Sequence, residues 1–208
     1  MRWERLFADL EGMVDEHERA HREAEIADRV RRELARVELS DRLRANDGRI
    51  ELLLRGGRLI RGDLIDAGSD WLVVDERHRG EVLVPVHAII EVSGLGRSVA
   101  APSDPRRLLS LRQALRVLAR HRVGVIVEDE LRRVRTGTID IVGADFFELA
   151  QHPLDMPRRG GTVLASRVIP YRAVVAVTTN VDQRASSPMA ARAGSANSAV
   201  SGSGVSAR

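Results

Sequence analysis

The sequence contains no cysteine and no lysine, and it is poor in aromatic residues. Without cysteine, disulfide bonds and thiolate metal sites are excluded, and a reducing compartment is the natural setting. Aromatic residues make up only 3% of the chain, so a core has to be built from Leu, Val, Ile and Ala. No apolar run approaches the roughly 18 residues of a membrane-spanning helix, and residues 1–13 lack a signal-peptide core. We therefore expect a cytoplasmic protein without a membrane span.

The charge of the chain is nearly balanced but unevenly distributed. All 33 basic residues are arginine, and with 30 acidic residues they leave a net charge of +3. Residues 105–122 contain six arginines and no acid, and residues 183–208 contain three arginines and no acid. This pattern predicts one basic helix and a basic tail rather than a protein covered in positive charge.

Residues 2–44 have the pattern of one long helix, with dense charge, a single glycine and no proline. A helix this polar needs a partner, which is either the rest of the chain or another chain in a coiled coil. The segment HERAH, residues 17–21, matches the H-E-x-x-H pattern of zinc proteases. Because Arg19 and Arg22 place charge beside it and no third ligand is evident, a solvated helix face is favoured and no metal is expected.

A strand-rich segment follows, over residues 46–97. Runs of Leu and β-branched residues are separated by Gly-Gly, Ala-Gly-Ser and His-Arg-Gly turns, which is the pattern of short strands. The expected strands are Arg49–Arg55, Arg58–Asp66, Trp71–Asp75, Glu81–Val84 and Ile89–Val92. Residues 98–122 are then expected to form a linker and a basic amphipathic helix, which Asp104 caps and Pro105 begins.

The strand pattern is repeated over residues 123–182. The segment TGTIDIVGADFFEL, residues 136–149, follows RGDLIDAGSDWLVV, residues 61–74, at a shift of 75 residues. Later in the repeat the shift is 85, which places Val84-Pro85 on Ile169-Pro170 and indicates a ten-residue insertion. The chain therefore contains two copies of one five-stranded unit. Residues 183–208, rich in Ala, Ser and Gly, predict a disordered tail.

Each five-stranded unit is small enough that it has to curl to bury its single apolar face, which predicts a small barrel. The segments Gly57–Gly62, Asp70–Val73 and Val86–Ile89 resemble the Sm-like family, and especially the bacterial Sm-like RNA chaperones. The resemblance covers about residues 40–135 and 106–180. It implies an α+β fold with a long N-terminal helix, two five-stranded Sm-like barrels joined by the basic helix, and a disordered tail with residues 1–45 forming the first helix.

The resemblance also implies single-stranded RNA as a ligand. His87 stands where the bacterial family has a histidine, and Tyr171 and Arg172 take that place in the second copy. Independently, the basic helix offers guanidinium groups that can bind phosphates. Its candidate nucleic-acid-binding residues are Arg106, Arg107, Arg112, Arg116 and Arg120. Two alternatives remain open for these arginines, namely ion pairs with acidic parts of the chain and contact with an anionic membrane surface.

Other candidate residues have simpler structural explanations. Asp70 and Asp145 could act in acid–base chemistry, but an aspartate before a strand more often accepts hydrogen bonds from turn amides. Trp71 and Phe146 could stack on bases, but their alternation with apolar neighbours favours packing in the core.

No glycine-rich phosphate loop, catalytic triad or dinucleotide fingerprint is visible, so we expect neither an enzyme nor a cofactor. The expected function is a non-enzymatic module that binds RNA. The alternative is a protein-interaction scaffold whose N-terminal helix mediates self-association or partner binding.

Overall fold

The computed structural model describes residues 21–22, 25, 28–29, 31–32, 34–77, 79–154 and 163–179. The chain divides into two compact units, with a boundary between Glu38 and Leu39. Each unit is considered by itself. The tail expected over residues 183–208 lies outside the described residues.

The expectation of one helix over residues 2–44 is wrong. Described residues between His21 and Leu34 are helical, but residues 35–38 leave the helical conformation and α2 (Leu39–Arg44) is a separate short helix. Because Leu43 and Arg44 are buried against the second unit's sheet, tertiary packing rather than helical periodicity determines this segment. A coiled coil is likewise not supported, and residues 1–20 lie outside the described part of the chain.

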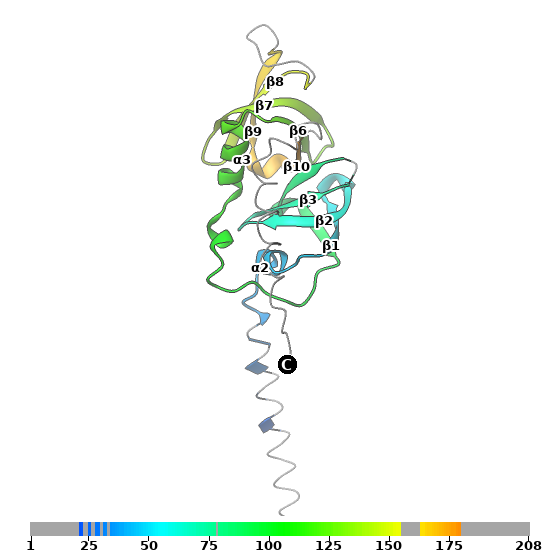
Figure 1. Cartoon of the computed structure of the whole chain (residues 1–208), viewed down its shortest axis with the longest axis vertical. Coiled ribbons are helices and arrows are strands. Elements are labelled where there is room, and N and C mark those ends of the chain that lie inside the picture. Colours follow the sequence, from blue (N-terminus) through cyan, green and yellow to red (C-terminus); the bar gives the residue numbers. More distant parts are fainter. Residues whose placement is uncertain are drawn as a thin grey trace, which may run out of the picture. The chain divides into compact units, whose positions relative to one another are not determined.

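The second unit is built on one ten-stranded antiparallel sheet (Figure 1). Its strand order is β5-β1-β2-β3-β4-β10-β6-β7-β8-β9. The strands are β1 (Arg49–Leu54), β2 (Leu59–Ala67), β3 (Trp71–Asp75), β4 (Glu81–Pro85), β5 (Ile89–Ser93), β6 (Gly124–Asp129), β7 (Val134–Val142), β8 (Phe146–Gln151), β9 (Ala165–Pro170) and β10 (Val174–Thr179). Short 3₁₀ turns η1 (Arg55–Gly57), η2 (Val86–Ala88) and η4 (Tyr171–Ala173) connect some of them.

The expectation of two separate barrels in an α+β fold is therefore also wrong. β4 pairs with β10, with Leu83 opposite Val177 and Val82 opposite Thr178, so the two halves share one sheet and the described fold is mostly β. Each strand supplies an edge that would otherwise carry unpaired backbone groups, and pairing satisfies both. The strand order within the first half, β5-β1-β2-β3-β4, is repeated in the second as β10-β6-β7-β8-β9.

The basic segment is not one continuous helix. A 3₁₀ turn, η3 (Pro105–Leu108), precedes the helix α3 (Leu111–Arg120), and Asp104 caps η3 by accepting a hydrogen bond from the Arg106 N–H. Between them the Leu109 carbonyl accepts hydrogen bonds from the Trp71 indole and the Ser69 N–H, each at 2.9 Å. The loop before β3 thus uses a carbonyl that a continuous helix would need for itself.

Two apolar clusters form the core, and each contains side chains from both halves. In the first, Trp71, Val73 and Leu83 of the first half pack with the buried face of α3 and with strands of the second half. In the second, Val175 and Ala176 of β10 pack with first-half residues. Trp71 is only 3% exposed, which confirms the prediction that it packs in the core.

A glycine in the middle of β2 and another in β7 permit unusually close strand contact. A Cβ atom on Gly62 would lie 2.2 Å from the Asp75 carbonyl oxygen, and one on Gly137 would lie 2.0 Å from that of Ala150. Both positions precede an irregularity in strand pairing, between Leu64 and Asp66 in β2 and at the equivalent place in β7. The repeat seen in the sequence therefore extends to backbone detail.

Candidate functional site

The helix α3 presents an apolar face to the protein and a basic face to solvent. Leu111, Ala114, Leu115 and Leu118 are buried, and the helix packs on β7 (Figure 1). Arg116 and Arg120 are exposed, and Arg112 is half-buried. Because these three arginines are spaced four residues apart, they follow one stripe of the helix surface.

Arg106 and Arg107 are engaged within the protein. Arg106 donates hydrogen bonds to the Asp104 carboxylate, the closest at 2.8 Å, and to the Arg44 carbonyl at 2.9 Å. The Arg106 hydrogen bond lowers the pKa of Asp104. Arg107 lies 3.6 Å from the Asp41 carboxylate of α2. For these two residues the structure shows ion pairs with acids of the chain itself.

The other three candidate arginines differ. Among the described residues, no hydrogen bond or ion pair joins the guanidinium groups of Arg112, Arg116 and Arg120 to another group. The Nε atom of Arg112 is buried and has no hydrogen-bond partner there. Three cations on one helix therefore remain available for an external anion.

Tyr171 lies beside these arginines. Its hydroxyl donates a hydrogen bond to the Gly143 carbonyl at 2.9 Å, and its ring stacks on Phe147 with centroids 6.4 Å apart. Burial raises the pKa of Tyr171, while the positive charges of Arg112 and Arg116 act to lower it. The structure thus brings Tyr171, Arg112 and Arg116 into one electrostatic environment, and Arg172 is exposed next to Tyr171.

His87 of η2 approaches the same region from the first half of the chain. Although the residue is exposed overall, partial burial of its ring lowers its pKa, and the charge of Arg55 acts in the same direction. Hydrogen bonding with the backbone of Val174 and Tyr171, and then the charge of Asp70, oppose that shift. His87 and Tyr171, which the sequence places far apart, are therefore neighbours.

The sequence gave no indication of Arg55 near this site. It precedes Gly56 and Gly57, both of which adopt a positive φ of 76°. The only available signal was an arginine at the entrance of a Gly-Gly hairpin.

Asp70 has a structural role at the start of α3. Its carboxylate accepts a hydrogen bond from the Leu111 N–H at 2.6 Å. The expectation that Asp70 bonds turn amides is thus corrected in its target, which is the first amide of a helix. Asp145, its counterpart in the repeat, is exposed.

Among the described residues no group of three or more His, Asp or Glu side chains is arranged to hold a metal ion. His21 lies 3.8 Å from Glu25 and both are exposed, whereas His17 lies outside the described part. No helix within the described ranges is long and apolar enough to cross a membrane.

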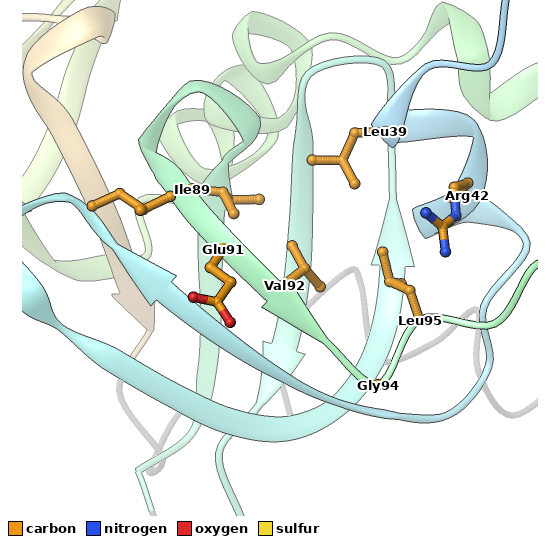
Figure 2. A pocket seen from close by; sticks show the side chains of 8 residues that line it. Leu39, Arg42, Ile89, Glu91, Val92, Gly94 and Leu95 are labelled. Atoms are coloured by element: carbon orange, nitrogen blue, oxygen red, sulfur yellow. The ribbon is translucent and has the colours of Figure 1, made fainter. Parts of the chain in front are cut away.

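A cavity of about 260 Å³ lies at the opposite kind of place, along the outermost strand β5 (Figure 2). Leu39 and Arg42 of α2 form one wall, and residues 89–92 of β5 form another. Figure 2 shows Leu39 facing Val92 across the opening, with Glu91 directed to the other side of the strand.

Comparison with known protein families, with curated proteins and with solved structures finds no match to this chain. The expected membership of the Sm-like family is therefore unsupported by any relative, and the single ten-stranded sheet contradicts the two separate barrels on which it rested.

Proposed function

We propose that this protein is a non-enzymatic binding protein that holds single-stranded RNA through the phosphates of its backbone. The contact surface is the α3 arginine surface, which we define as Arg112, Arg116 and Arg120. The observation that carries the proposal is that these three arginines have no partner among the described residues, whereas Arg106 and Arg107 do.

The chemistry of these side chains suits a polyanion. A guanidinium group donates two parallel hydrogen bonds to a phosphate, and it keeps its charge at every relevant pH. Successive arginines four residues apart are separated by about 6 Å along the helix axis. The buried leucine face fixes the helix on β7, so the arginines are presented from a rigid support.

The small number of free arginines limits the expected affinity. Three phosphate contacts to a single strand give a salt dependence, expressed as log K against log salt, with a slope of about −2. We therefore expect binding at low salt that weakens clearly at physiological salt.

The test is fluorescence anisotropy of labelled single-stranded RNA with the full chain across a salt series. In the variant Arg112→Gln/Arg116→Gln/Arg120→Gln, glutamine keeps an extended side chain while removing the charge. We expect its affinity at low salt to fall at least about tenfold, and its salt slope to approach zero, since each phosphate contact contributes to both.

A control variant removes the same charge elsewhere. Arg79, Arg97 and Arg133 are exposed and lie outside α3, and changing all three to Gln should leave the affinity within about twofold if α3 is the site. Unchanged binding by the α3 variant, or equal loss in the control, would contradict the proposal. Duplex DNA serves as a competitor that tests the preference for a single strand.

A protein-interaction scaffold is the second candidate function. The observation that favours it is the set of large apolar side chains exposed on the outermost strands, including Ile90 at 62% and Val168 at 63%. A role for residues 1–45 in that function remains a prediction.

A further inference from the structure

The ten-stranded sheet ends in two edges without a neighbouring strand. β5 pairs only with β1, and β9 pairs only with β8. We call the outer sides of β5 and β9 the two free edges. Backbone groups along such an edge can pair with a further strand, which makes each free edge a template for association.

The two free edges are of the same kinds as the two edges that meet inside the molecule. The internal junction joins β4, the fourth strand of the first half, to β10, the fifth strand of the second half. Outside the junction remain β5, the fifth strand of the first half, and β9, the fourth strand of the second. A molecule therefore carries one unused copy of each half of its own junction.

Exposure of equivalent side chains follows this division. Leu83 on β4 is 3% exposed, and Val168, its counterpart 85 residues later on β9, is 63% exposed. Val175 on β10 is 1% exposed, and Ile90, its counterpart on β5, is 62% exposed. Apolar side chains that the junction buries in one half are therefore open to solvent on the free edges of the other.

The cavity at β5 occupies the place that the junction fills in the second half. Val92 of the cavity corresponds to Val177, and Leu39 corresponds to Ala114 of α3. Val177 and Ala114 belong to the same apolar cluster as Leu83. The cavity in Figure 2 is thus the open equivalent of the site where Leu83 packs.

We propose that β9 of one molecule pairs with β5 of a second copy of this chain, antiparallel and in the register of the internal junction. That register places Val168 opposite Val92 and Arg167 opposite Ser93. Val168 then covers the cavity at β5, as Leu83 covers its equivalent in the second half.

Charge is complementary across this pairing. Both Glu91 on β5 and Arg167 on β9 are exposed. In the same register they are diagonal neighbours on one face of the sheet, which is within reach of long side chains. The contact is head-to-tail, so it uses both free edges of every molecule and gives a ring if the rotation closes or a filament if it does not.

The test measures molar mass in solution for the full chain, by light scattering after size-exclusion chromatography. We expect the wild type to be larger than a monomer at about 100 μM, a concentration at which even weak specific interfaces form. Ile90→Asp blocks only the β5 edge, and Val168→Asp blocks only the β9 edge. Each variant alone should be monomeric.

A mixture of the two variants separates this contact from any other. The Ile90→Asp chain keeps an intact β9 edge and the Val168→Asp chain keeps an intact β5 edge, so an equimolar mixture should form a dimer and stop there. Leu108→Asp, at a position 78% exposed and away from both edges, should retain the wild-type mass.

Exchange of the two charges gives a second measurement. Glu91→Arg or Arg167→Glu alone should weaken association, and the two together should restore it. A monomeric wild type, edge variants with unchanged mass, or a mixture that remains monomeric would each overturn the proposal. Ile90 and Val168 are exposed in the single molecule, so circular dichroism of the variants should match that of the wild type.

Discussion

Arg58 connects the two halves of the protein through a pair of carboxylates. Its guanidinium lies 2.7 Å from Glu128 of β6 and 3.0 Å from Glu76, which follows β3. The Arg58 side chain is only 15% exposed, and both carboxylates are similarly shielded. Two negative charges held in so little water depend on this one cation.

Replacing Arg58 with Ala should therefore lower the free energy of unfolding by about 3 kcal/mol, because two shielded carboxylates lose their counter-ion. Urea unfolding followed by far-UV circular dichroism measures the effect. Arg61→Ala is the matched control, since its partner Glu51 and Arg61 itself are largely exposed. An exposed pair should contribute less than about 1 kcal/mol. Equal losses for both variants would show that burial of the Arg58 cluster has no special weight.

Single residues also mark what the sequence could predict. Burial of Trp71 followed from its apolar alternation, which is a local signal. The ion pairing of Arg106 and Arg107 did not, because the acid that Arg107 meets, Asp41, lies more than 60 residues away in the sequence. A charge pattern along the chain cannot identify such a partner.

At the scale of elements, the start of α3 depends on the loop before β3. The carboxylate of Asp70 accepts a hydrogen bond from the first amide of the helix, and Leu109 is held by Trp71 and Ser69. A negative charge at this end also interacts favourably with the helix dipole.

Asp70→Ala should lower the free energy of unfolding by about 1 to 2 kcal/mol, because the loss of a helix N-terminal acceptor has a cost of that size. The repeat supplies the control, since Asp145 occupies the equivalent position before β8, with no helix amide recorded on its side chain among the described residues. Asp145→Ala should change stability by less than about 0.5 kcal/mol. Thermal or urea unfolding of both variants decides; similar values would remove the proposed role of Asp70.

Most strands were predictable from the sequence because strand signals are local. The expected strand Trp71–Asp75 coincides with β3, and the expected Ile89–Val92 differs from β5 by one residue. The expected helix from Pro105 failed because contacts from Ser69 and Trp71 interrupt it at Leu109. At the candidate site, the stripe of Arg112, Arg116 and Arg120 was visible from spacing alone, whereas the approach of His87 to Tyr171 depends on the fold.

At the scale of the whole molecule, the two halves form one structural body because β4 and β10 share hydrogen bonds and both clusters are mixed. Neither periodicity nor turn signals could predict this pairing, since it joins strands more than 80 residues apart. A repeat in sequence is compatible equally with two separate domains and with one fused sheet.

Leu83→Ala should destabilise both halves together, by about 2 to 4 kcal/mol, because it opens a cavity in a cluster that they share. Native-state hydrogen exchange measures this residue by residue, and protection in β2 and β7 should fall by the same amount. Leu59→Ala, at a position 41% exposed, should have a much smaller effect. Loss of protection confined to β3 and β4 would show that the halves unfold independently.

The position of β10 has a consequence for synthesis on the ribosome. It is the last described strand in the chain, yet it lies in the middle of the sheet between β4 and β6. Until residues 174–179 emerge from the exit tunnel, β4 and β6 have no strand to join them, and the Leu83 side of β4 stays open. At roughly 5–20 residues per second, the interval between completion of β6 and arrival of β10 lasts several seconds. During that time the nascent chain presents apolar edges to chaperones and to neighbouring nascent chains on the same messenger.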